Sequence, residues 1–92
     1  KDRPKLVIGF SAETENVIKN SKKKIKDKHC DLIVANDVSK KDVGFNSNYN
    51  KVSIIYKDGT IHSIPKNKKS FIANKIAEAI LDKLLINDKN FN

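Results

Sequence analysis

A chain of 92 residues has room for one domain at most, or for part of one, because a protein of this size buries only about 60% of the surface that its unfolded chain exposes. Hydrophobic residues make up 38% of the chain and charged residues 33%, and no apolar run approaches the roughly 20 residues that cross a bilayer, which excludes a membrane span. The formal net charge is +8, so acidic partners have to be considered.

Cysteine usage and the first residues bear on the compartment. Cys30 is the only cysteine, so no internal disulfide can form, and the opening residues KDRPKLVIGF lack the pattern of a secretory signal. We therefore expect a reducing, cytoplasmic location, and we expect Cys30 to belong to the core.

Two apolar runs rich in β-branched residues predict the first two strands, at 5–10 and 31–37. Both runs are nearly continuous, which is typical of strands buried on both faces. A helix-length segment lies between them, and its apolar or small positions recur at spacings of three and four: Val17, Ile18, Ser21 and Ile25. This strand-helix-strand order favours parallel strands joined by a right-handed crossover.

The turn into this helix offers several polar groups. We expect the first strand to end at residue 10, with Ser11 or Thr14 as the N-cap of the helix. Glu13 and Glu15 would then suit the positive end of the helix dipole.

The next segments predict a loop and a hairpin. Residues 38–50 carry glycine, serine and asparagine with little periodicity, which is typical of a loop. Residues 51–65 alternate around Asp58-Gly59, the pair that best accepts a two-residue type I′ turn. This turn sets the predicted pairs, which are Tyr56 with Ile61 and Ile55 with His62.

The closing segment, 68–85, predicts an amphipathic helix with one apolar stripe formed by Ile72, Ile76, Ile80 and Leu84. The predicted order is β-α-β-loop-β-β-α, an α/β fold. Its sheet has too few strands and too many open edges for an independent domain. We therefore expect residues 1–92 to be the C-terminal segment of a larger domain whose upstream half lies outside this sequence.

Candidate binding residues follow the first strand. Ligands of open α/β sheets gather beyond the carboxyl ends of the strands. Phe10 is expected at such an end, beside Gly9, while Asn36 and Asp37 end the second run. An exposed phenylalanine could stack on a nucleotide base, which is worth about 1–3 kcal/mol in nucleic-acid complexes. The alternative is that the Phe10 ring caps the core.

The first helix carries most of the local charge. The stretch KNSKKKIKDK concentrates six lysines against one aspartate. Lys24 and Lys28 are four residues apart and therefore share one helix face. An anion such as a triphosphate, held between them, would relieve their mutual repulsion. The alternative is a solvated face whose lysines complement the helix dipole.

No catalytic or metal-binding motif is apparent in the sequence. His29 and His62 are isolated from other candidate ligands in the sequence. Asp37 and Asp42 are weak evidence for magnesium without a phosphate-cradling loop, and no nucleotide-binding glycine motif or nucleophile elbow occurs.

Several motifs nevertheless occur in a familiar order. LVIGFSAET, the spaced lysines, DLIVANDVS, GFNSNYN, the KDG hairpin and a closing helix follow one another as in phosphopantothenoylcysteine synthetase. Over residues 5–85 the chain resembles this family, the ligase half of the bifunctional flavoprotein of coenzyme A synthesis, also grouped as the DNA/pantothenate metabolism flavoprotein family. The resemblance implies a Rossmann-like domain that uses CTP to activate 4′-phosphopantothenate as an acyl-cytidylate and couples it to the amine of cysteine.

The resemblance also implies roles for individual residues. Phe10 would contact the nucleotide, and Lys24 and Lys28 would contact its phosphates, with Mg²⁺ expected in the full enzyme. No catalytic residue would lie within this segment, and FMN would bind only in a fused decarboxylase domain. Ser11, where alanine is common, and Asn48, where an acidic residue is frequent, depart from the family pattern without breaking the match. The resemblance assigns no role to Asn36 or Asp37.

Assembly can be predicted from the hairpin at 51–65. Its predicted faces both carry apolar residues, with Val52, Ile54, Tyr56 and Ile61 on one and Ile55 and Ile64 on the other. A second copy of the hairpin could cover one face, and the resemblance implies a homodimer of this kind. The alternative is a monomer in which the closing helix covers that face.

Two other functions compete with the ligase. The lysine-rich helix could bind RNA or DNA without sequence specificity, although Arg3 is the only arginine and no series of exposed aromatic residues accompanies the lysines. The chain could also belong to another Rossmann-type enzyme, such as a nucleotide-sugar or short-chain reductase. A glycine-rich start and a KxKK-type stretch upstream of residue 1 would favour the ligase.

Overall fold

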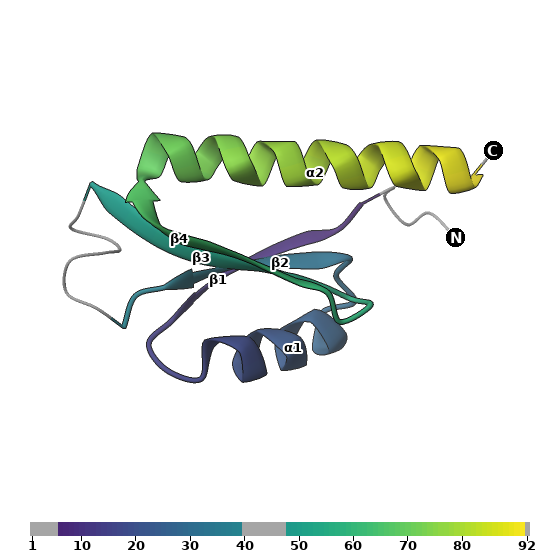
Figure 1. Ribbon diagram of the computed structural model, residues 1–92. Helices are drawn as coiled ribbons and strands as arrows, with labels where there is room; N and C mark the ends of the chain where they lie inside the picture. Colours follow the sequence, from purple (N-terminus) through teal and green to yellow (C-terminus); the bar gives the residue numbers. More distant parts are fainter. Residues whose placement is uncertain (1–5, 40–47, 92) are drawn as a thin grey trace.

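The computed structural model describes residues 6–39 and 48–91. The elements follow the predicted order: β1 (Ile8–Glu13), α1 (Val17–Asp27), β2 (Leu32–Asp37), β3 (Tyr49–Tyr56), β4 (Ile61–Lys68) and α2 (Lys69–Phe91). Figure 1 shows three layers, with α1 on one face of the sheet and α2 on the other. The predicted α/β class is confirmed. Residues 40–47, which hold Asp42 and most of the GFNSNYN motif, lie outside the described residues.

The four strands form one mixed sheet in the order β1-β2-β3-β4. β1 and β2 are parallel, as predicted, and the remaining neighbours are antiparallel. β1 continues to Glu13, so the prediction that it ends at residue 10 is wrong. The reason is its ladder with β2, which runs on past Phe10 until Glu13 pairs with Asp37. Phe10 is therefore a mid-strand residue.

Each face of the sheet has its own core. The α2 side buries Leu32, Val34, Val52, Ile54, Ile64, Ile72 and Ala79. The α1 side buries Ile25, Cys30, Ile33, Ala35 and Ile55. Successive residues of β2 enter the two cores alternately, which explains its continuous apolar run. The predicted core position of Cys30 is confirmed.

The start of α1 differs from the prediction. Asn16 precedes the helix with a φ of 49°, and no side chain caps the helix. Ser11 and Glu13 belong to β1, and the first turn contains no acidic residue. The predicted caps, Ser11 or Thr14, are therefore wrong, because the longer strand leaves only a short turn before Val17.

The hairpin register is shifted by one residue from the prediction. Three residues, 57–59, form the loop, since the Tyr56 N–H donates to the Thr60 carbonyl and the Gly59 N–H donates to the Tyr56 carbonyl. Gly59 has a φ of 96°. Ile55 consequently pairs with Ile61 rather than His62. A one-residue shift exchanges the faces of a strand, so Ile64 joins Val52 and Ile54 under α2.

The closing helix extends further than predicted and reaches Phe91. Its stripe is confirmed at Ile72 and Ile76, which pack into the core on the α2 side. In the parts of the chain that the structure describes, no helix combines the length and apolar character needed to cross a membrane.

Candidate functional site

The carboxyl end of β1 carries an ion pair whose carboxylate is buried. Glu13 is the last residue of this strand, and its side chain is only 7% exposed. The Lys24 ammonium lies 2.5 Å from Glu13 Oε2 and donates a hydrogen bond to it. This reach follows from helix geometry, because side chains lean toward the N-terminus of a helix, and α1 starts beside the end of β1. The hydrogen bond from Lys24 holds the pKa of Glu13 below its usual value.

Lys28 lies one turn further along α1, directly after its last residue. Its backbone N–H donates to the Lys24 carbonyl, which places the two residues on the same side of the helix, as predicted. The chain then enters β2 beside the start of β1, where the Asp31 N–H donates to the Val7 carbonyl. Lys28 therefore lies toward the amino end of β1, whereas the ammonium of Lys24 lies at its carboxyl end.

Phe10 faces the opposite side of the sheet. A Cβ at Gly9 would point toward Cys30 and Ile33 in the core on the α1 side, whereas Ile8 packs in the core on the α2 side. Alternation along β1 places Phe10 with Ile8. Its side chain is 66% exposed, so it does not cap the core. The structure thus brings Lys24 and Lys28 to one face and leaves Phe10 on the other, while their binding roles stay predictions.

Polar groups that the sequence reasoning left without a role link the three neighbouring strands. The Asn36 amide donates to the Ser11 carbonyl, at 3.2 Å, and accepts from the Asn50 amide, at 2.8 Å. Asn36 and Asn50 therefore connect β1, β2 and β3 through side chains. The position of Asn36 at the end of an apolar run was the sequence signal, but its partners could not be read from it.

Asp37 is held in place beside this network. Its Oδ1 accepts from the backbone and the hydroxyl of Ser39, at 3.0 and 2.6 Å, and the Lys51 ammonium lies 3.6 Å from its Oδ2. Burial opposes ionisation of this carboxyl, but the Ser39 hydrogen bonds and the charge of Lys51 hold its pKa below the usual value. Asp37 therefore ends β2 as a carboxylate with partners of its own.

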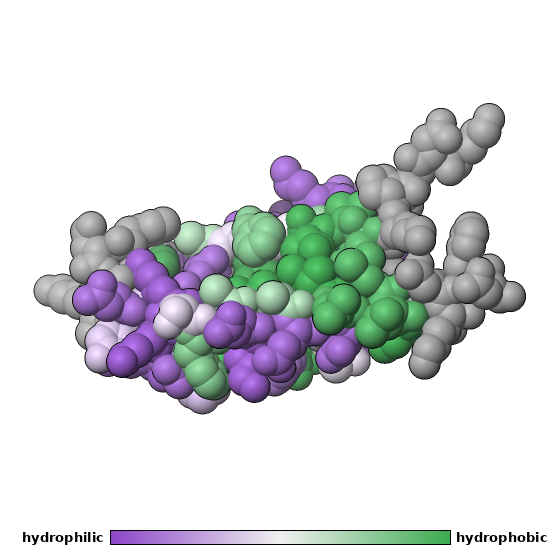
Figure 2. Space-filling view, turned by 90° about the horizontal axis from the view of Figure 1, so that it is seen from above, coloured by the Kyte–Doolittle hydropathy of each residue, from purple (hydrophilic) through white to green (hydrophobic). Residues whose placement is uncertain are grey.

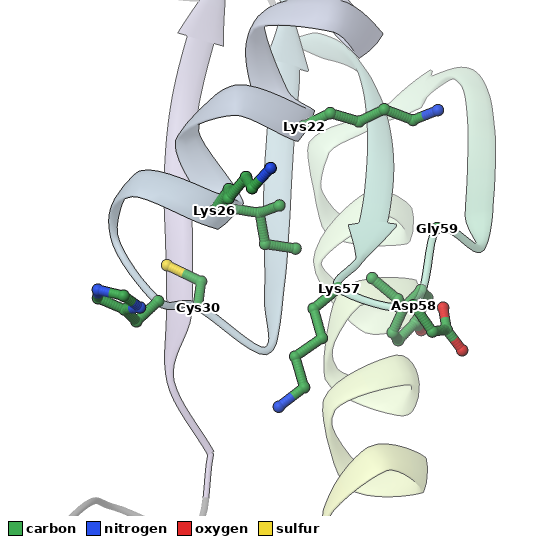
Figure 3. A pocket seen from close by; sticks show the side chains of 9 residues that line it. Lys22, Lys26, Cys30, Lys57, Asp58 and Gly59 are labelled. Carbon is green, nitrogen blue, oxygen red and sulfur yellow. The ribbon is translucent and has the colours of Figure 1, made fainter.

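A separate cleft lies between the C-terminal half of α1 and the turn of the hairpin. It has a volume of about 740 Å³, and three lysines line it: Lys22, Lys26 and Lys57. Figure 3 shows that Lys22 and Lys57 point away from each other. The ammonium of Lys57 lies 3.3 Å from Oδ1 of Asp31, a buried residue whose other oxygen accepts from the Val7 N–H. These charges do not converge on one anion, so we do not place the nucleotide here.

The described part of the chain shows no side-chain cluster that could bind a metal ion. Residues 6–39 and 48–91 contain no group of three or more histidine, cysteine, aspartate or glutamate side chains arranged to hold one. These residues therefore do not fit a Mg²⁺ site built by protein side chains alone.

Comparison with known families identifies the chain. The family described as the DNA/pantothenate metabolism flavoprotein C-terminal domain matches residues 1–84. The chain belongs to this family. The resemblance seen in the sequence is thereby confirmed.

Members of this family include longer relatives. The coenzyme A biosynthesis bifunctional protein CoaBC of Bacillus subtilis is 36% identical over 80 residues, which are 87% of this chain and 20% of that protein. CoaBC of Vibrio cholerae is 37% identical over 84 residues, 91% of this chain and 21% of that protein. The chain thus spans about a fifth of the length of these curated relatives.

A solved structure of the family has the same fold. The crystal structure of the C-terminal domain of CoaBC superimposes with a TM-score of 0.67 at 34% sequence identity. The superposition covers 90% of this chain and 36% of that domain. The strands and helices described above therefore match about a third of that crystallised chain.

Proposed function

We propose that this chain is the C-terminal segment of a phosphopantothenoylcysteine synthetase domain, a CTP-dependent ligase that joins 4′-phosphopantothenate to cysteine in coenzyme A biosynthesis. The observation that carries the proposal is the family match over residues 1–84, which include the strand of Phe10 and the helix of Lys24 and Lys28. The segment supplies nucleotide-binding and dimer-forming elements. The upstream half of the domain supplies the catalytic groups, so the segment alone is inactive.

The reaction places one specific demand on these residues. A carboxylate oxygen of 4′-phosphopantothenate attacks the α-phosphorus of CTP, and pyrophosphate leaves. The amine of cysteine then attacks the carbonyl of the acyl-cytidylate, and CMP leaves. Cationic groups beside the phosphates favour the first step, because they stabilise the negative charge that develops on the departing pyrophosphate. Lys24 and Lys28 fill this role in the proposal.

The geometry of β1 constrains how one nucleotide meets all three residues. Phe10 and the two lysines lie on opposite faces of the sheet, so the nucleotide has to pass around the carboxyl end of β1. Its base would lie on the side of Phe10 and its phosphates on the side of α1. Each lysine contact would be a charge-assisted hydrogen bond, which contributes about 1.5–3 kcal/mol.

Neither cofactor of the wider family is assigned to residues of this chain. Mg²⁺ enters the proposal with the phosphates of CTP, since the described side chains form no metal site of their own. FMN belongs in the proposal to a fused decarboxylase domain only.

The surface of the chain supports the idea of a larger domain. In the described sheet β1 pairs on one side only, with β2. Large apolar side chains are exposed on α2, among them Leu81, Leu85 and Ile86, and Phe10 is exposed on β1. Figure 2, seen from the side of α2, shows apolar residues gathered toward the C-terminal half of this helix. We assign the apolar surface of α2 and the open edge of β1 to contact with the upstream half, and Phe10 to contact with the nucleotide.

The proposed homodimer uses a different part of the chain. The hairpin has its faces covered in β3, where Ile54 packs under α2 and Ile55 under α1. β4 is the other edge of the described sheet, and its Ile61 is 39% exposed. The dimer contact that we propose therefore runs along β4 and its exposed Ile61 rather than through the buried isoleucines of β3.

The test is a set of lysine variants in the full-length protein. Lys24→Ala and Lys28→Ala should each weaken CTP binding about tenfold or more. Lys28→Ala should leave the melting temperature nearly unchanged, whereas Lys24→Ala should lower it, because it leaves the buried Glu13 carboxylate without its counter-charge. Lys22→Ala is the matched control. It removes the same charge from the same helix, but Lys22 lines the cleft between α1 and the hairpin turn. Unchanged CTP affinity in the first two variants would contradict the proposal. An equal loss in all three would indicate a general basic surface, as in the nucleic-acid alternative.

A further inference from the structure

Glu13 and Lys24 form an unequal pair. The Glu13 side chain is 7% exposed, whereas that of Lys24 is 46% exposed. An ammonium group has three N–H donors, and one of them is directed to Glu13 Oε2. Because nearly half of the lysine side chain is open to solvent, its remaining donors can meet an anion that approaches from outside.

The pair should persist when such an anion binds. Removal of Lys24 would leave a buried carboxylate without its counter-charge, and breaking a buried pair in this way is strongly unfavourable. In the described part of the chain, Ser11 and Asn20 also hydrogen-bond with Glu13 as neutral side chains, and Asp37 is its partner in the β-ladder. Asp37 cannot neutralise Glu13, so Lys24 stays with it.

The charge of Glu13 then acts on the bound anion. A phosphate that contacts Lys24 lies within a few ångströms of the Glu13 carboxylate, and the two negative charges repel each other across a partly buried site. A buried pair is screened by salt less than an exposed one. Lys24 can therefore donate hydrogen bonds to a phosphate from a fixed position, but the Glu13 carboxylate offsets part of its charge.

We propose that Glu13 is a positioning residue that holds Lys24 at the carboxyl end of β1 and lowers the affinity of this site for the phosphates of the nucleotide. This inference rests on the proposed function, since it requires Lys24 to contact phosphate. Its consequence is faster release of nucleotide and pyrophosphate than an unpaired lysine would allow.

The deciding variant is Glu13→Gln in the full-length protein. Glutamine keeps the size of the side chain and an oxygen that can accept from Lys24, but it removes the negative charge. We expect CTP and inorganic triphosphate to bind about three- to tenfold more tightly. The affinity should also fall more steeply with salt than in the wild type, because the site gains one net positive charge. If Glu13 had a purely structural role, Glu13→Gln would neither raise the affinity nor change its salt dependence.

Further variants separate the possible outcomes. Glu13→Gln should raise the affinity less in the Lys24→Gln background than in the wild type, because without Lys24 the phosphate is no longer held beside residue 13. Glu78→Gln is the control, since it removes a carboxylate that pairs with Lys75 on the surface of α2, and it should leave affinity unchanged. Glu13→Asp serves if the glutamine variant does not fold, and it should bind with intermediate affinity.

The inference fails if the folded Glu13 variants bind triphosphate with unchanged or lower affinity while Lys24→Gln weakens binding. In that case the proposed phosphate contact of Lys24 still stands. If Lys24→Gln itself leaves the affinity unchanged, the proposed function of this lysine fails first.

Discussion

Gly9 lies so close to Cys30 that a methyl group on Gly9 would come within 3.1 Å of the Cys30 sulfur. The same methyl group would lie 3.2 Å from Cγ1 of Ile33. Both neighbours belong to the core between α1 and the sheet. Any larger residue than glycine in this strand therefore requires Cys30 or Ile33 to shift by a few tenths of an ångström.

Gly9→Ala should destabilise the full-length protein by about 1 kcal/mol, because crowding in the core outweighs the gain that alanine brings to a strand. Thermal unfolding measures the effect. Combining the change with Cys30→Ala should cost less than the sum of the two single variants, since the smaller side chain makes room. A higher melting temperature for Gly9→Ala would show that this space can relax.

Phe10→Ala should affect binding more than stability. The ring is 66% exposed, so its loss should change the free energy of unfolding by less than about 1 kcal/mol. Loss of a stacking contact should weaken CTP binding by about 1–3 kcal/mol. Calorimetric titration and thermal unfolding of the same samples measure both quantities. Phe71→Ala, which removes another exposed aromatic side chain, is the comparison. Normal CTP binding by Phe10→Ala would contradict the proposed stacking contact.

Stability should depend on the charge of Glu13 in acid. Its folded-state pKa lies below the usual 4.5, chiefly because Lys24 donates a hydrogen bond to it. The pair therefore stabilises the fold above pH 4.5, and this contribution is lost as the pH falls through the lowered folded-state pKa. Urea unfolding between about pH 7 and pH 3 should show wild type more stable than Glu13→Gln at neutral pH, with the difference shrinking in acid. A constant difference over this range would mean that the pair contributes no net charge interaction.

Ile61→Lys should dissociate the proposed homodimer into folded monomers. Ile61 is 39% exposed at the edge strand β4, where a charge opposes edge-to-edge contact. Sedimentation of the full-length protein should show a dimer for wild type and a monomer for the variant at the same concentration. Phe71→Lys, at a side chain of similar exposure on α2, is the control. The fully buried Ile55 is unsuitable for this test, because a lysine there would disrupt the core. A dimer that tolerates Ile61→Lys uses another surface.

Local patterns were enough to predict the kind and order of the elements. The run at 31–37 is apolar at successive positions because β2 feeds two cores, and such a strand is recognisable without its neighbours. The stripe of Ile72 and Ile76 likewise predicted the buried face of α2. Family membership could also be predicted from the sequence, because the motifs occur in the linear order of the family.

Pairing between distant segments decided what the sequence left open. β1 reaches Glu13 because its ladder with β2 continues to Asp37, twenty-four residues later in the chain. That extension made Glu13, which was expected at the positive end of the helix dipole, the buried partner of Lys24, and it moved Phe10 from a strand end to mid-strand. The hairpin shows the same limit, since a loop of three residues instead of two reversed the faces of β4. Side-chain periodicity reports which residues share a face, but only the hydrogen-bond register with another strand determines where a strand ends and which core each face enters.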